Sequence, residues 1–201
     1  MSPASGVYKL RGNLSDEFAH PLNLEQSDWD RIQHITNAVG PVSSWERPRF
    51  RWADVHLGDD YADGEEGRLD LPRPDLDWFG ELLVSARAWR LLEPLMGEHV
   101  QALPVDFTTG EECFILNVLT VLAGVIDPVA SQAEYFKSGR IMRVERMVFG
   151  VDDPLYNWPP AFRIAEMRAT RFINAEVREL IRDAGLTGGA FTPVEVRLKP
   201  R

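Results

Sequence analysis

The pattern of apolar and polar positions becomes regular from Asp77 onward, where strand and helix periods can be followed along the chain. Leu82–Val84 predicts a brief strand, Val100–Phe107 predicts a longer one, and Cys113–Leu122 is a nearly continuous apolar run. Because a strand that is apolar at successive positions buries both of its faces, Cys113–Leu122 is expected at the centre of a sheet. Further strands are predicted at Arg140–Phe149, Ala161–Ala165, Thr170–Ile173 and Thr192–Leu198.

Two helices in the same region are predicted from their capping residues and from apolar spacing. The first follows Ser85 as N-cap and stops at Gly97, and Pro94 in its last turn is expected to distort or shorten it. Its apolar face is expected to contain Ala88, Leu91, Leu92 and Leu95. The second follows Asn174 as N-cap and ends at Gly185. Its apolar face is expected to contain Val177, Leu180, Ile181 and Ala184.

The beginning of the chain is less regular. Val7–Arg11 predicts a short strand and Ser27–Val39 a short helix, whereas the glycines, prolines and carboxylates of Gly58–Pro74 predict a mobile loop. We therefore predict an α+β fold, in which a mostly antiparallel sheet carries a few short helices. A loop-rich N-terminal segment, residues 1–75, would pack on a core formed by residues 76–201.

The composition of the chain limits the kinds of molecule that it is expected to bind. The chain has 201 residues, which suits one domain, and its 44% hydrophobic content is enough for a core. Its 31 acidic and 22 basic residues give a formal net charge of −9. That balance argues against a protein that binds the phosphate backbone of nucleic acid. It favours solubility, or attraction to a cationic partner.

Cysteine content and apolar run lengths bear on the compartment. Cys113 is the only cysteine, so an internal disulfide is not possible, and its apolar surroundings predict a buried thiol. Met1–Arg11 has no hydrophobic segment of the kind found in a signal peptide. The longest apolar stretch, Leu116–Ile126, is far shorter than the roughly 20 residues of a membrane helix. We therefore expect a cytoplasmic protein that does not associate with a membrane.

Residues that could hold a metal or perform catalysis do not form a recognised motif. No two histidines have the spacing of a zinc site; they are His20, His34, His56 and His99. Asp59, Asp63, Gly64 and Asp70 fit four positions of a calcium loop, but Tyr61 occupies a ligand position and the last ligand is normally glutamate. Phosphate-binding and nucleophile motifs are also missing. The sequence therefore predicts neither a metal site, nor a cofactor, nor catalytic residues.

One cluster combines aromatic and basic side chains, and it leaves three readings open. Its members are Trp45, Arg47, Arg49, Phe50, Arg51 and Trp52. Such a cluster can stack on single-stranded nucleic acid, although six carboxylates between Asp59 and Asp70 follow it. Alternatively, its aromatic rings pack on the sheet while its arginines face solvent. It can also form a surface for a protein partner, since tryptophan and arginine are common interface anchors.

The order of short motifs from about Asp75 to the C-terminus resembles immunity protein family eleven of bacterial polymorphic toxin systems. The matching motifs are Leu83-Val84-Ser85, Leu92-Glu93-Pro94-Leu95, Val100–Val105, Leu116-Asn117-Val118, Asp127, Ser131, Phe162-Arg163 and Gly185–Phe191. Ile126 departs from the leucine that is usual in the family, and the first 75 residues match only loosely. The shared residues are of the kind that form strand cores, caps and turns.

This resemblance implies a non-enzymatic immunity protein that binds a cognate toxin encoded by an adjacent gene and covers its active or substrate-binding surface. Whether the chain forms homo-oligomers is not predicted. The candidate contact residues come from the exposed, charged and aromatic tract around the acidic loop. They are Trp45, Arg49, Trp52, Asp59, Asp60, Tyr61, Asp63, Glu65 and Glu66.

Two other functions remain open. The chain can be a structural or regulatory protein-binding module, which a large exposed apolar patch would favour. It can also be an enzyme with dispersed residues, of which Arg163, Asp127 and Ser131 are the best candidates. A structural reading of the same residues has Arg163 paired with a carboxylate, while Asp127 and Ser131 hold a turn.

Overall fold

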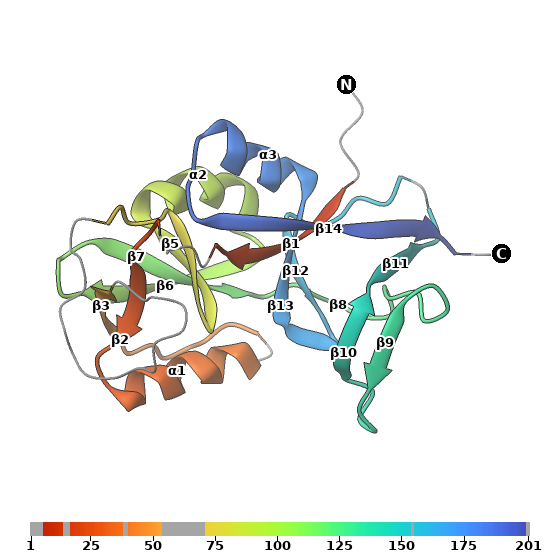
Figure 1. Ribbon diagram of the computed structural model, residues 1–201, viewed down its shortest axis with the longest axis horizontal. Helices are drawn as coiled ribbons and strands as arrows, with labels where there is room; N and C mark the ends of the chain where they lie inside the picture. The colour runs from red at the N-terminus through yellow and green to blue at the C-terminus, as the bar shows by residue number, and fades with distance from the viewer. Residues whose placement is uncertain (1–5, 14–16, 38–39, 54–70, 154, 200–201) are drawn as a thin grey trace.

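A computed structural model describes residues 6–13, 17–37, 40–53, 71–153 and 155–199 (Figure 1). These residues form three helices and fourteen strands, with 45% strand against 18% helix. The α+β class and the predominance of sheet are therefore confirmed.

The first six-stranded sheet, which we call sheet I, has the strand order β2-β3-β6-β7-β5-β4. Its strands are β2 (His20–Asn23), β3 (Arg49–Ala53), β4 (Leu76–Phe79), β5 (Glu81–Ser85), β6 (Val100–Phe107) and β7 (Glu112–Val118). Neighbouring strands are antiparallel except β3 and β6, which are parallel. Because β7 lies between β5 and β6, the predicted central position of its apolar run is confirmed.

Helices cover both faces of sheet I (Figure 1). The three helices are α1 (Gln26–Asn37), α2 (Ala86–Met96) and α3 (Ala175–Asp183). Side chains alternate along a strand, so Ile115 of β7 joins the apolar cluster of α1, whereas Leu116 joins that of α2 and α3. Both side chains are fully buried, which explains why this strand is apolar at consecutive positions.

The second six-stranded sheet, sheet II, has the order β11-β14-β1-β13-β12-β8. Its strands are β1 (Val7–Gly12), β8 (Val121–Leu122), β11 (Val148–Val151), β12 (Ala161–Ile164), β13 (Met167–Asn174) and β14 (Gly189–Leu198). The β11–β14 and β12–β8 pairs are parallel and the others antiparallel. The predicted N-terminal strand thus lies between two strands from the other end of the chain.

The remaining strands, β9 (Gln132–Tyr135) and β10 (Ile141–Arg146), form a separate two-stranded ribbon. Figure 1 shows this ribbon toward the opposite end of the long axis from β2 and β3. The end of the ribbon next to its loop is attached to sheet II, because the Ile141 amide donates a hydrogen bond to the Glu166 carbonyl at 2.8 Å.

Two predicted strands prove to be divided between different sheets. In the Cys113–Leu122 run, β7 ends at Val118 and the chain crosses to sheet II, where β8 pairs with β12. In the Arg140–Phe149 run, β10 belongs to the ribbon and β11 to sheet II. An apolar run reports burial but carries no information about which neighbour a strand pairs with, so these two predictions were wrong in extent.

Helix α2 also differs from its prediction. Its N-cap is Ser85 as expected, but Leu91 is 39% exposed, while Trp89 and Met96 are buried instead. The buried face of α2 is therefore rotated about the helix axis relative to the predicted face. Pro94 does not shorten the helix, which reaches Met96. A proline near a C-terminus removes only one helical hydrogen bond, and the Gly97 amide still bonds to the Glu93 carbonyl.

Candidate functional site

The described part of the predicted contact tract lies on and beside β3. The Trp45 indole is half-buried and donates a hydrogen bond to the Pro104 carbonyl at 2.7 Å. Trp52 is only 6% exposed and stacks on Phe107, with ring centroids 4.4 Å apart. Arg49 is exposed. In this arrangement Arg49 and one side of Trp45 are available to a partner, whereas Trp52 belongs to the core of α1 and sheet I.

The candidate contact residues in the acidic part of this tract lie outside the described residues, and so does the calcium-loop pattern. The contact residues concerned are Asp59, Asp60, Tyr61, Asp63, Glu65 and Glu66.

A second exposed surface lies on the β9–β10 ribbon, which sequence reasoning did not single out. Phe136 and Met142 are each 53% exposed and Tyr135 is 43% exposed. Lys137 and Arg140 stand in the loop between the two strands, so the apolar side chains are accompanied by positive charge. Large exposed apolar side chains gathered on one element are unusual in a monomer and are typical of an interaction surface. The sequence predicted a strand only at Arg140–Phe149, which contains Met142 but neither Tyr135 nor Phe136.

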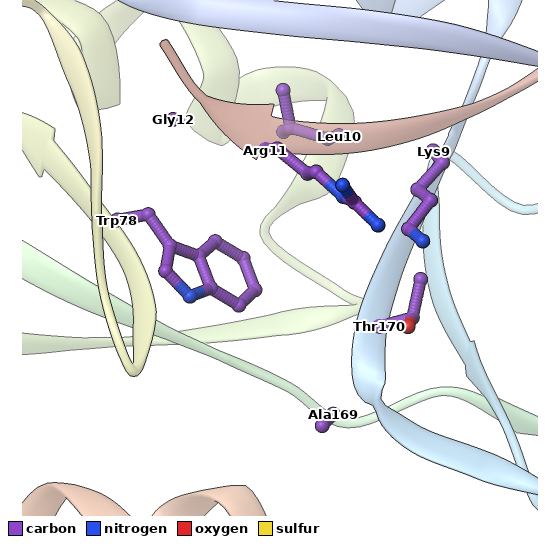
Figure 2. Close-up of a pocket in the computed structure, with 7 residues that line it drawn as sticks. All are labelled: Lys9, Leu10, Arg11, Gly12, Trp78, Ala169 and Thr170. Atoms are coloured by element: carbon purple, nitrogen blue, oxygen red, sulfur yellow. The ribbon is translucent and has the colours of Figure 1, made fainter. Parts of the chain in front are cut away.

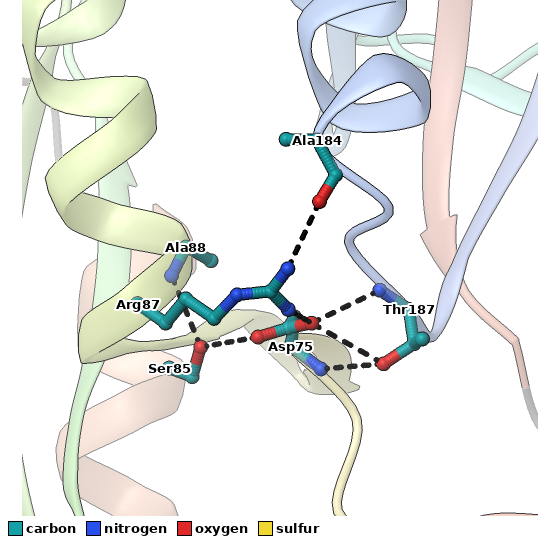
Figure 3. A network of polar contacts seen from close by, with 6 residues as sticks. All are labelled: Asp75, Ser85, Arg87, Ala88, Ala184 and Thr187. Carbon is teal, nitrogen blue, oxygen red and sulfur yellow. Dashed lines mark hydrogen bonds and ion pairs between the residues drawn. The ribbon is translucent and has the colours of Figure 1, made fainter.

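The motifs shared with the immunity family meet one another inside the fold. Asp75 lies at the centre of one such junction, between the first turn of α2 and the loop after α3 (Figure 3). One carboxylate oxygen of Asp75 accepts from the Ser85 hydroxyl at 2.9 Å, and the other accepts from Arg87 at 2.7 Å and from the Thr187 amide at 3.2 Å. Ser85 in turn caps α2 through the Ala88 amide. The Ser85 motif and the Gly185–Phe191 motif are therefore held together by hydrogen bonds to the same residue, Asp75.

A second junction connects the Leu-Asn-Val and Phe-Arg motifs. The guanidinium of Arg163 reaches the side-chain oxygen of Asn117 and the carbonyl of Thr36, each at 3.4 Å. Arg163 is fully buried. Burial and the neighbouring Arg171 charge lower the pKa of Arg163 to about 10, and Glu81 opposes this shift. Arg163 thus ties sheet II to sheet I and to the end of α1.

Asp127 and Ser131 hold a turn, as the structural reading predicted. An Asp127 carboxylate oxygen accepts from the Val129 and Ala130 amides at 2.9 and 3.0 Å. The Ser131 hydroxyl donates to the Val148 carbonyl and accepts from the Val148 amide, which fixes the turn to β11. Asp127, Ser131 and the buried Arg163 therefore all have structural contacts.

Cys113 and the residues of metal-binding types are the remaining candidates for reactive or metal-binding groups. Cys113 is buried, and desolvation raises the pKa of its thiol to about 12, which leaves it a poor nucleophile. Within the described ranges, no three residues among the usual metal-binding types form a group that could hold an ion. None of the described helices combines the length and the apolar content that a bilayer crossing requires.

Comparison with known proteins identifies the family to which this chain belongs. Residues 23–196 match the model of the Immunity protein family (Imm11). The chain therefore belongs to this family, and the resemblance found from the sequence motifs is confirmed. Membership indicates a role in immunity to a toxin. A search of curated proteins finds no significant match.

Proposed function

We propose that the protein binds a cognate toxin and neutralises it by covering the toxin's active or substrate-binding surface, without enzymatic activity of its own. Family membership is the observation that carries this proposal. The structure supports it because the matched motifs form internal joints, as in the Asp75 and Arg163 networks, and so build a scaffold whose exposed surface is left for binding. A cytoplasmic location and a toxin gene adjacent to this one belong to the same proposal.

The contact surface is proposed at the tract that begins with Trp45 and Arg49 and continues through Asp59–Glu66. The acidic part of this tract and the net charge of −9 would attract a cationic toxin surface and raise the association rate at low salt. The β9–β10 ribbon is the competing surface, because its aromatic side chains are exposed. Figure 1 places β3 and the ribbon toward opposite ends of the molecule, so separate variants can distinguish the two surfaces.

The test is co-expression with the product of the adjacent gene, followed by growth measurement, size-exclusion chromatography and titration calorimetry. We expect rescued growth and a one-to-one complex. Arg49→Glu should weaken binding about 30-fold or more if Arg49 is an interface anchor. Arg90→Glu, an equal charge change at an exposed position of α2, should leave the affinity unchanged.

The variants also separate failure of the location from failure of the function. If Phe136→Asp abolishes binding while Arg49→Glu does not, the interface lies on the ribbon and the proposed contact tract is wrong. If the neighbouring protein forms no complex and growth is not rescued, the toxin-neutralising function itself is wrong. A stable homodimer formed through the ribbon would favour the structural-module alternative.

A further inference from the structure

A pocket of about 320 Å³ lies where β1 and β13 of sheet II meet β4 of sheet I. Its described lining residues combine two cations, an indole and a hydroxyl, without a carboxylate among them. These lining side chains are Lys9, Arg11, Trp78 and Thr170. The volume is at the lower end of the range for small-molecule sites.

Both cations reach the pocket because they stand two positions apart on β1. Alternate side chains of a strand point to the same face, so Lys9 and Arg11 share one face while Leu10, between them, is buried in the opposite one. Figure 2 shows the Lys9 and Arg11 side chains leaving β1 toward the same space, with Trp78 approaching from β4. Positive charge is thus concentrated in one place on a chain whose net charge is −9.

Among the described residues, no carboxylate forms an ion pair with either cation. No side-chain hydrogen bond or ion pair joins Lys9 or Arg11 to another residue in the part of the chain that the structure describes. Glu145 and Glu195 line a second pocket together with Lys9, but they are paired with Arg143 at 3.0 Å and with Arg146 at 2.7 Å. Burial and the Arg11 charge lower the pKa of Lys9, as expected for a cation that lacks a negative partner.

The Trp78 indole is in contact with a buried cation. The guanidinium carbon of Arg171 lies 5.9 Å from the centre of the Trp78 ring, and Arg171 is itself ion-paired to the buried Glu81. Trp78 therefore offers a fixed apolar surface beside two cations. A ligand that carries an anionic group next to a flat ring would satisfy both parts of the pocket.

We propose that this pocket binds a small anion attached to a flat apolar ring, of the aryl phosphate or aryl carboxylate class. Lys9 and Arg11 bind the anionic group, and the ring lies against Trp78. Because the pocket joins strands of both sheets, a bound ligand stabilises the junction between them. The inference is independent of toxin binding, since the isolated full-length chain is sufficient to test it.

The test titrates the full chain with phenyl phosphate, benzoate, inorganic phosphate and phenol, using calorimetry and the indole signal of Trp78 in nuclear magnetic resonance spectra. We expect phenyl phosphate or benzoate to bind with a Kd of about 1 mM or lower, and inorganic phosphate and phenol to bind about tenfold more weakly. The Trp78 signal should shift on binding, and the affinity should fall as salt concentration rises.

Three variants locate the site. Lys9→Met and Arg11→Gln should each weaken binding about tenfold, whereas Arg90→Gln removes an exposed cation from α2 and should change nothing. If Lys9→Met fails to fold, Arg11→Gln and the Trp78 signal still decide. The proposal is overturned if neither aryl anion binds at about 10 mM, or if both pocket variants bind as well as the unaltered chain. Equal affinity for phenyl phosphate and inorganic phosphate would overturn the role of the ring.

Discussion

Charged side chains without solvent exposure lie where the two sheets meet. Arg163 and Glu81 are fully buried and Arg171 is 1% exposed. A buried charge is stable only with compensating partners, and removal of one partner is far more costly than replacement of the whole pair. Arg171 is paired with Glu81, and Arg163 contacts Asn117. These residues therefore specify how the sheets are joined.

Cys113 should make the stability of the protein depend on pH in the alkaline range. Burial raises the pKa of its thiol from 9.0 to about 12. As pH rises, the unfolded chain releases this proton first, so the folded state holds more protons between pH 9 and about 12. The contribution of the thiol is fully present below this window and is lost through it. The free energy of unfolding should fall by up to about 1.4 kcal/mol per pH unit from this group.

Urea unfolding at several pH values, compared between the unaltered chain and Cys113→Ala, measures this contribution. Lysine and tyrosine titrate in both proteins, so their effects cancel in the difference. The stability difference between the two proteins should change in favour of Cys113→Ala as pH rises. Parallel stability curves would show that the thiol has an ordinary pKa.

At the scale of elements, the loop after α3 is fixed by contact with the start of β4. Gly188 has a φ of +84°, and an added Cβ would lie 2.1 Å from the Leu76 carbonyl oxygen and 2.4 Å from the Pro74 Cβ. The Leu76 amide also bonds to the Thr187 carbonyl at 2.9 Å. The Gly188 position therefore requires glycine both for its backbone conformation and for the close approach of β4.

Gly188→Ala should destabilise the protein much more than Gly110→Ala. Gly110 has a similar φ of +81°, but an added Cβ would meet nothing within 4 Å. Gly110→Ala should cost only the left-handed backbone penalty, about 1–2 kcal/mol. Gly188→Ala adds a clash with backbone, so a loss of about 4 kcal/mol or more is expected in chemical denaturation. Equal losses would mean that the loop moves away from β4 easily.

At the scale of the whole molecule, the two ends of the chain are combined in sheet II. β1 pairs with β13 along one side and with β14 along the other. Val7 and Leu10 of β1 are each only 1% exposed. The N-terminal residues also supply β2 and β3 to sheet I, together with α1, which packs on one face of that sheet. Both sheets therefore contain strands from either side of residue 75. The division of the chain at that residue stays a prediction.

This topology leads us to expect that residues 76–201 do not fold alone. Without β1, the facing edges of β13 and β14 lose their hydrogen-bond partners and the apolar contacts of Val7 and Leu10. Circular dichroism and urea titration of this fragment should show no cooperative transition, whereas the full chain should show one. Addition of a peptide spanning residues 1–13 should restore part of the structure. A fragment that unfolds cooperatively near the midpoint of the full chain would establish residues 76–201 as an independent domain.

The sequence by itself determined what depends on local chemistry. Ser85 and Asn174 were recognised as helix caps, the apolar run of β7 as a central strand, and Asp127 with Ser131 as a turn, because each signal lies within a few residues. The order of such motifs also identified the immunity family.

Only the tertiary structure decided which distant segments meet. The split of one apolar run between two sheets, the junction of Asn117 with Arg163, and the gathering of Lys9, Arg11 and Trp78 around one pocket all depend on strand pairing. Pairing is set by burial and hydrogen bonding summed over the whole chain. A local pattern shows that a strand will be buried, but the partner that buries it is fixed only when every other strand has found its place.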